Sequence, residues 1–320
     1  MKALTLTKNR EGGSRSKELL GIIVPFLGLI FIIVFFQLTT GGKLLSSNNL
    51  KTFSNYAFQA IVPACGLLFL MSQGEMDFSM AGIVCISATF GAMVSKTSIL
   101  LAVLAMIASA LVMGAINGAA HVFLRVPSFI ATMAASFVYS GLASVLLGGG
   151  SITANYDFKN ADTTFLKYGA ILLIMLITYI VFQCSPFGKH CRAIGAKAEV
   201  PYQAGVNVKL TKFVPFLISA LACAVVAVFA LVRTCAAATI TGSNTQVNAM
   251  LALLLGGVPF SGGWNSKFRS VIIGGLIMAV ITNGLFLLNL STANQQLIKG
   301  VIFIVAVAIS FDRKNTAVIK

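Results

Sequence analysis

Residues 98–118 read SILLAVLAMIASALVMGAING, and this stretch contains no charged side chain. A helix that crosses the hydrocarbon core of a bilayer needs about 20 mostly apolar residues. The stretch therefore predicts a transmembrane helix. Gly114 and Gly118 lie four residues apart in it, a spacing that lets two membrane helices pack closely.

The composition of the whole chain agrees with a fold built in lipid. Of its 320 residues, 58% are hydrophobic and 10% are charged, and the mean hydropathy is +0.93. Soluble domains carry about 25% charged residues, so this chain could not cover a water-exposed surface. No hydrophilic stretch is long enough for a separate soluble domain. We expect one transmembrane domain over residues 19–312, between a basic tail, 1–18, and a short tail, 313–320.

Nine further apolar runs resemble 98–118, so the sequence predicts an all-α integral membrane protein with about ten transmembrane helices. A signal peptide is the alternative for the first run, but its apolar core is too long and no small-residue cleavage site follows it. The run 246–257 is too short to cross alone, so it is tilted, extended at its ends or broken. The ten segments are 20–38, 56–72, 78–95, 98–118, 128–147, 167–184, 213–232, 246–257, 270–288 and 294–311.

Lysine and arginine set the expected orientation. With ten crossings and the N-terminus in the cytoplasm, 16 of the 23 basic residues fall inside, six fall outside, and Lys299 lies in the last helix. Cytoplasmic loops of membrane proteins carry such an excess of positive charge. Both termini are therefore predicted to be cytoplasmic. The basic segments on that side are the two tails and the loops 119–127, 185–212 and 258–269.

Several function classes lack support in the sequence. The net charge of +15 does not indicate a nucleic-acid partner, because the basic residues lie between apolar runs. The six cysteines show no CxxC or Cys/His spacing, so no metal site is predicted. No HExxH, GxSxG or GxxxxGK[ST] motif is present. An intramembrane enzyme is therefore disfavoured, no cofactor is expected, and ATP would have to be bound and hydrolysed by a separate subunit.

A faint internal repeat points to a transporter. Asn117-Gly118 and Asn283-Gly284 lie 166 residues apart, and small polar residues follow each pair. Five helices in each half would make the two halves inverted in the membrane, as in many transporters. Coincidence between two Asn-Gly pairs is the alternative. We expect Asn117 and Asn283 to bond across helices or to line the solute path.

The polar break Gln73–Asp77 separates two apolar runs and is short enough to lie at membrane depth, facing protein or water rather than lipid. Asp77 has two interpretations. It can cap the following helix by accepting from the amides of Ser79 and Met80, which is the favoured one, or it can line the path.

The loop 185–212 can form a short helix from Arg192 to Ala204, interrupted by Gly195 and Pro201 and ended by Gly205. Its small residues would let another protein approach the backbone closely. An ordinary basic loop and a docking helix are both compatible with this pattern.

Four segments of the chain resemble the membrane subunit of ribose-type ABC sugar importers, within the superfamily of branched-chain amino acid and sugar permeases. They follow the family's order and cover most of the chain. Departures are Phe78 for leucine, Lys197 for asparagine and Val206 for isoleucine. The matching segments are Gly74-Glu75-Met76-Asp77-Phe78-Ser79, Asn117-Gly118 with Leu124 to Thr132, Gly188 to Asn207, and Leu254 to Gly263.

The resemblance implies a non-catalytic permease subunit that works by alternating access. Its expected partners are a cytosolic ABC ATPase that docks on loop 185–212, an extracytoplasmic sugar-binding protein and a second permease subunit, identical or homologous. The solute would be ribose or another small polar molecule. An ion-coupled carrier is the alternative, but Glu75, Asp77 and Lys299 are the only charged candidates within the helices. For ATPase coupling the resemblance points to Gly188, Arg192, Ala193, Gly195, Glu199 and Gly205, with Arg192 seated in a groove of the ATPase.

Overall fold

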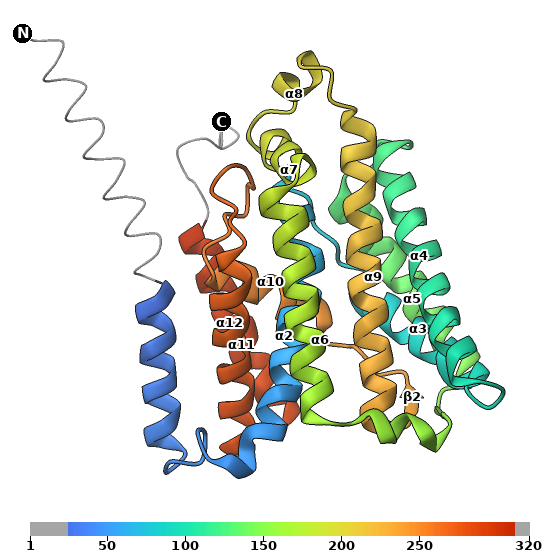
Figure 1. Ribbon diagram of the computed structural model, residues 1–320, viewed down its shortest axis with the longest axis vertical. Coiled ribbons are helices and arrows are strands. Elements are labelled where there is room, and N and C mark those ends of the chain that lie inside the picture. The colour runs from blue at the N-terminus through green and yellow to red at the C-terminus, as the bar shows by residue number, and fades with distance from the viewer. Residues whose placement is uncertain (1–24, 311–320) are drawn as a thin grey trace, which may run out of the picture.

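The computed structural model describes residues 25–310, so both predicted tails and the start of the first predicted helix lie outside the described residues. A helix covers part of each of the ten predicted segments, and the described chain is mostly helical (Figure 1). Six helices are long and apolar enough to cross a membrane. They are Ser47–Ser72, which joins η1 (Ser47–Asn49) to α2 (Leu50–Ser72), then α4 (Ile99–Val122), α5 (Ser128–Leu146), Thr164–Cys184, α9 (Val208–Thr234) and α11 (Arg269–Leu287).

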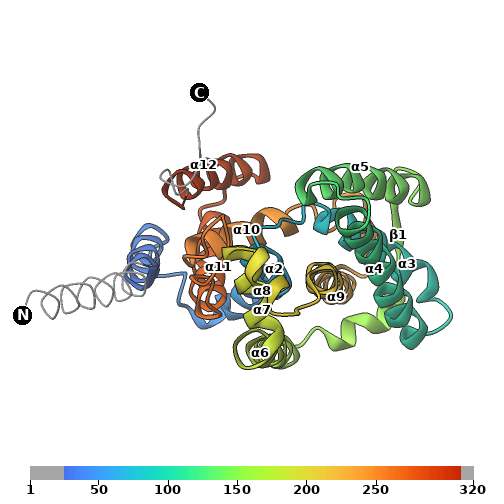
Figure 2. The same cartoon turned by 90° about the horizontal axis from the view of Figure 1, so that it is seen from above.

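Helices α2 and α9 form the centre of the protein. Over an 18-residue apolar stretch of Ser47–Ser72, 78% is buried, whereas over the corresponding stretch of α5 only 17% is. Seen from above, α2 and α9 lie between the α10–α11 side and the α3–α4 side (Figure 2). Gly66 of α2 meets Ser219 and Ala222 of α9 so closely that an added Cβ would come within 2.7 Å of the Ala222 methyl group. Small residues at such a crossing let two helix backbones approach, which is how membrane helices gain packing energy.

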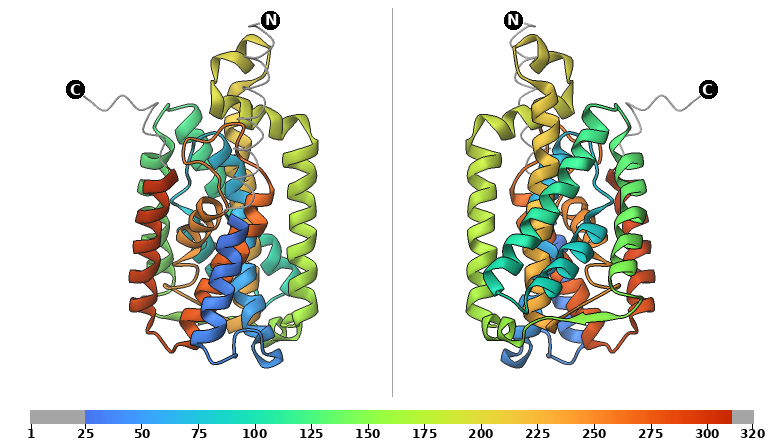
Figure 3. Two further views of the ribbon diagram at one scale, coloured as in Figure 1. Left: turned by 90° about the vertical axis from the view of Figure 1, so that its left-hand side faces the viewer. Right: turned by 90° about the vertical axis from the view of Figure 1, so that its right-hand side faces the viewer.

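Four shorter apolar helices complete the bundle. Two of them, α3 and α10, are largely buried inside the protein rather than laid against its outside. This placement explains how 246–257 can be too short to cross alone: the helix is surrounded by protein over most of its length. Helices α6 and α12 stand at opposite edges (Figure 3). The four short helices are Pro25–Thr39, α3 (Met80–Val94), α10 (Thr245–Leu255) and the apolar stretch Thr292–Ala308 of α12 (Thr292–Ser310).

The two ends of the bundle differ in what they carry. One end, called here the α7 end, holds α7 (Pro186–Ala196) and α8 (Glu199–Gln203). The opposite end, called here the ribbon end, holds an antiparallel pair of strands, β1 (Ser151–Thr153) and β2 (Ala236–Ala238), with η2 (Tyr156–Ala161). Figure 1 shows α8 and β2 at these opposite ends. The ribbon is a small departure from the predicted all-α fold.

Two details of loop 185–212 also differ from the prediction. Helix α6 (Thr164–Tyr179) ends in a π-helical turn, η3 (Ile180–Cys184), and Pro186 then begins α7 instead of only ending α6. Proline suits the first turn of a helix, where its missing N–H has no partner to lose. The region after Arg192 is not one helix but two, since Lys197 has extended backbone angles. Gly205 follows α8 with φ +79°, as expected for a residue that ends it.

Candidate functional site

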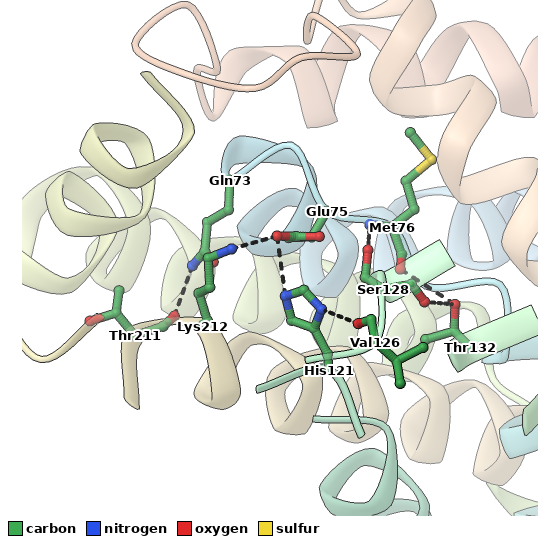
Figure 4. Close-up of polar contacts among 9 residues, drawn as sticks. All are labelled: Gln73, Glu75, Met76, His121, Val126, Ser128, Thr132, Thr211 and Lys212. Atoms are coloured by element: carbon green, nitrogen blue, oxygen red, sulfur yellow. Dashed lines mark hydrogen bonds and ion pairs between the residues drawn. The ribbon is translucent and has the colours of Figure 1, made fainter. Parts of the chain in front are cut away.

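The candidate site is a junction at the α7 end, where the four segments singled out in the sequence meet. We call it the inner junction and define it by loop 73–79, the ends of α4 and α9 nearest to it, α7, and the turn 258–263. Figure 4 shows its polar contacts. The loop 73–79 lies against protein, as predicted for this break: Gln73, Met76, Asp77 and Ser79 are all at most 7% exposed.

Glu75 is the electrostatic centre of the inner junction. Its Oε1 lies 2.7 Å from Lys212 Nζ on α9 and 3.1 Å from His121 Nε2 on α4, and Figure 4 shows it between the two. Burial alone would raise the pKa of the Glu75 carboxyl, but hydrogen bonds from His121, Lys212 and Ser128 lower it to about 2. The carboxylate therefore stays charged at neutral pH and holds three elements together.

Backbone amides of the same loop find partners on α5, and the side chain of Gln73 finds one on α9. Ser128 Oγ accepts from the Met76 amide at 3.2 Å, and Thr132 Oγ1 accepts from the Phe78 amide at 3.0 Å. Gln73 Nε2 donates to the Thr211 carbonyl at 2.8 Å. An irregular segment buried in protein needs such partners, because an unpaired backbone group at membrane depth is costly.

Asp77 lies deeper in the protein and is fully buried. Its Oδ1 accepts from the Ser79 amide at 2.9 Å, which is one of the two bonds expected of a cap. Its Oδ2 accepts from Ser219 Oγ on α9 at 2.9 Å, a partner that the sequence did not suggest. Asp77 therefore links the start of α3 to the central helix α9 as well as fixing its own loop.

Asn117 joins the same buried network, in agreement with its expected bonding across helices. Its Nδ2 donates to Ser79 Oγ at 2.6 Å, and Tyr139 OH donates to its Oδ1 at 3.0 Å. Three helices, α3, α4 and α5, are thereby connected through one asparagine. Asn283 lies apart from this network: its side chain is fully buried and finds no hydrogen-bond partner within the described part of the chain.

Glycines close the inner junction by letting backbones touch. A Cβ on Gly195 would lie 2.1 Å from the Ser72 carbonyl oxygen and 2.7 Å from the Gly263 amide nitrogen. Gly263 N donates to that Ser72 carbonyl at 2.8 Å. A Cβ on Gly188 would lie 1.9 Å from the Phe182 carbonyl oxygen. Both glycines therefore allow close packing within this chain.

The expected contact of Arg192 with a groove of an ATPase stays a prediction, and within this chain the residue packs inward. Its side chain is buried, with 7% of the residue exposed. Nε donates to the Gly188 carbonyl at 3.2 Å, and the guanidinium lies over the rings of Phe182 and Trp264, at 5.1 Å and 5.8 Å. A guanidinium that is buried and stacked in this way holds α7 in place.

The longest exposed stretch of loop 185–212 follows α7 and includes most of α8. Glu199 and Gly205 are exposed, whereas Ala193 is half-buried. Val200 and Tyr202 of α8 are 60% and 73% exposed. Beside them is a hollow of about 570 Å³, which is lined in part by Phe187, His190, Gly205 and Leu210. Of the six residues predicted for coupling, Gly188, Arg192 and Gly195 thus seat α7, Ala193 is half-buried, and Glu199 and Gly205 lie at the surface.

The comparisons with known proteins decide the family. The family described as "Branched-chain amino acid transport system / permease component" matches residues 49–307. The chain belongs to this family. The match includes all four segments of the inner junction. The permease is thus a multi-pass protein of the bacterial inner membrane and a non-catalytic subunit, and ATP hydrolysis occurs in a separate subunit.

Curated relatives of the permease match it over most of its length. The ribose import permease protein of Bacillus subtilis is 28% identical, over 92% of this chain and 93% of the relative. The xylose transport system permease protein of Haemophilus influenzae is 24% identical, over 92% and 97%. The L-arabinose transport system permease protein of Escherichia coli is 28% identical, over 78% of each chain. No solved structure matches the permease.

The sequence missed two members of the buried network, Ser219 and Tyr139. Each is a hydrogen-bonding residue inside an otherwise apolar run. Isolated polar residues in membrane helices often bond across helices, so a signal was present. The partner of each could not be deduced, because it lies on another helix far away in the sequence.

Proposed function

We propose that this permease forms the membrane path of an ATP-driven importer for a monosaccharide. Relatives that match most of the chain are named for ribose, xylose, D-allose and L-arabinose. These are all small neutral sugars, so the proposal names the class and leaves the individual sugar open. Family membership also favours ATP-driven import over the ion-coupled carrier considered from the sequence.

The observation that carries the mechanism is the seating of α7 on the end of α2. Gly195 touches the Ser72 carbonyl, and the chain then continues through the exposed α8 into the central helix α9. A push on α8 is therefore passed to α9 and, through the Lys212–Glu75 ion pair, to loop 73–79. Rigid elements that move against each other in this way are the usual basis of alternating access.

The docking surface for the ATPase is assigned to α8 and the hollow beside it. Val200 and Tyr202 offer apolar area at the α7 end, and Glu199 and Gly205 lie next to them. Exposed apolar and aromatic residues that rise from a polar, basic surface are typical of anchors in protein interfaces. In this assignment Arg192 is a positioning residue that keeps α7 fixed beneath α8.

For the membrane topology we infer ten crossings, two inverted halves and cytoplasmic termini. A long helix, a short helix and two further apolar helices follow in the order α2–α5 and again in the order α9–α12. The break after α2 lies at the α7 end and the break after α9 at the ribbon end, which is the relation expected of inverted repeats. The α7 end carries the basic loop 185–212, so it is the cytoplasmic end.

The partners follow from the same proposal. A second permease subunit, identical or homologous, faces this one across the path, and an extracytoplasmic binding protein delivers the sugar at the ribbon end. The permease itself needs no cofactor, because ATP is bound by the ATPase.

Vesicle transport tests the proposal. The full-length permease would be reconstituted with its ATPase and binding protein, and uptake of radiolabelled D-ribose, D-xylose, D-allose and L-arabinose measured. We expect uptake of at least one sugar that requires ATP and both partners. Uptake by the permease alone, driven by a proton or sodium gradient, would overturn the proposal in favour of the ion-coupled carrier.

A further inference from the structure

A second polar region lies at the ribbon end, away from the inner junction. A hollow of about 510 Å³ is bounded by the outer parts of α2, α3 and α9, the loop 235–244 and the starts of α10 and α12. Its rim includes the exposed residues Arg233 and Ser243, and its floor includes the buried residues Thr245 and Asn248. Small-molecule sites are commonly hollows of about 300–1,000 Å³ with a few converging polar groups.

Apart from Arg233 at the rim, the polar side chains of this outer hollow are amides and hydroxyls. Gln59, Asn244 and Asn248 supply amides, and Thr241, Thr245 and Thr292 supply hydroxyls. Among the described residues that line it, none is acidic. Its chemistry is therefore different from that of the inner junction, where a carboxylate is paired with cations. Groups that both donate and accept without a net negative charge suit a ligand with several hydroxyl groups.

Two residues of α12 donate hydrogen bonds to the side-chain amides of Asn248 and Asn244. Lys299 Nζ donates to Asn248 Oδ1 at 3.1 Å, and Gln296 Nε2 donates to Asn244 Oδ1 at 3.4 Å. Asn244 and Asn248 are four residues apart and thus share a face of α10, while Gln296 and Lys299 share a face of α12. Each Oδ1 keeps a second lone pair beside this bond and each Nδ2 can donate, so both asparagines offer hydrogen-bonding groups to the hollow that they line.

We propose that the outer hollow is a sugar-binding subsite of the path, at which Gln59, Asn244 and Asn248 hydrogen-bond the hydroxyl and ring oxygens of a neutral monosaccharide. The apolar lining, which includes Val226 and Phe229, contacts the C–H face of the sugar. This inference deepens the proposed function and rests on it. It assigns recognition to residues of the permease itself, in addition to the binding protein.

The test uses the reconstituted importer and the sugar, among the four above, that the unchanged protein takes up best. Asn248→Leu and Gln59→Leu keep the approximate side-chain size and remove the hydrogen-bonding groups. Thr292→Val provides a third variant at the rim. The matched control is Asn160→Leu, since Asn160 is an exposed asparagine at the same end that does not line the hollow. Uptake kinetics and ATP hydrolysis stimulated by the loaded binding protein are measured for each.

We expect Asn248→Leu and Gln59→Leu each to raise the KM for uptake by about tenfold, the cost of about 1.4 kcal/mol in lost hydrogen bonds. The KM and the stimulated ATP hydrolysis of Asn160→Leu should stay unchanged. An unaltered KM in both amide variants and in Thr292→Val would overturn the subsite. Preferred uptake of D-ribose 5-phosphate, lost in Arg233→Gln, would overturn the assignment of a neutral sugar. The proposed function fails separately, if the unchanged permease shows no ATP-dependent uptake at all.

Discussion

The two breaks in the bundle, loop 73–79 after α2 and loop 235–244 after α9, lie at opposite ends and are built differently. The first is filled: Glu75 is paired with Lys212 and His121, and Gly195 is pressed onto the Ser72 carbonyl. The second leaves a hollow of about 510 Å³ with amide and hydroxyl groups around it. The break after α2 is thus a tightly packed joint between helices, whereas the break after α9 borders the outer hollow.

This difference suits the two tasks of an importer. A joint that transmits a motion must resist deformation, and backbone contacts together with buried ion pairs give it a fixed geometry. A subsite on a path must release its solute, so uncharged groups that form a few hydrogen bonds are preferable there. Each prediction below alters one of these two regions and measures whether the other is affected.

The largest effect is expected from Gly195→Ala in the inner junction. The new methyl group would lie 2.1 Å from the Ser72 carbonyl oxygen, and the backbone there cannot rotate away as a side chain could. Overpacking of this kind costs about 1–3 kcal/mol or more. We expect a lower melting temperature in detergent and loss of ATP-dependent uptake. Gly169→Ala is the control, since an added Cβ on Gly169 of α6 meets nothing within 4 Å, and it should behave like the unchanged protein.

Glu75→Gln tests the electrostatic part of the joint. The folded-state pKa of Glu75, about 2, is below its ordinary value of 4.5. Its charge therefore contributes stability that is fully present above pH 4.5 and is lost as the pH falls toward 2. We expect the free energy of unfolding of the variant to be about 1–3 kcal/mol lower at pH 7, measured as a lower melting temperature. The difference in melting temperature from the unchanged protein should become smaller as the pH falls.

Glu199→Gln is the matched control for Glu75. Its ion pair with Lys197 is formed at 3.2 Å, but the two side chains are 76% and 68% exposed. Exposed pairs of this kind contribute little to stability, so the melting temperature of Glu199→Gln should equal that of the unchanged protein at every pH. If the difference in melting temperature between Glu75→Gln and the unchanged protein did not depend on pH, the role given to the charge of Glu75 would be contradicted.

Much of the fold, but less of the site, could be predicted from the sequence. Each apolar run contains a helix because its side chains can be buried only in lipid or protein, and the break at Gln73 was recognised because polar residues interrupt such a run. The three-residue strands of the ribbon could not be predicted, since Ala236–Ala238 has no alternation of polar and apolar residues. The inward orientation of Arg192 could not be predicted either, because a basic residue in a predicted cytoplasmic loop is expected to face water.

The outer hollow illustrates the same limit. Asn244 and Asn248 have a helical spacing that marks a shared face, and Lys299 stands out as a cation in an apolar helix. That these residues meet depends on the packing of α10 against α12. The sequence alone does not give this packing, because both helices are apolar around most of their circumference.

Tyr139→Phe tests the buried network behind the inner junction and should have a smaller effect. The change removes the hydroxyl, whose oxygen lies 3.0 Å from Asn117 Oδ1 and 3.1 Å from the Met113 carbonyl oxygen and whose one proton can be donated to either. One buried hydrogen bond contributes about 0.5–1.5 kcal/mol, so the melting temperature should fall modestly. Tyr156→Phe, at an exposed tyrosine of the ribbon end, should leave it unchanged. An equal fall in both variants would show that the network adds nothing specific.

The smallest effect on stability, and the sharpest contrast between the two regions, is expected from Lys299→Met. Lys299 is buried, with 5% of the residue exposed, and its ammonium group donates to Asn248. Replacing a buried cation by an apolar side chain of similar length is often neutral or stabilising, so the melting temperature should not fall. Asn248 would lose the bond that orients it, and the KM for uptake should rise by about two- to tenfold with little change in kcat. A purely structural lysine would give the opposite pattern, a lower melting temperature with an unchanged KM, and that result would remove Lys299 from the outer hollow.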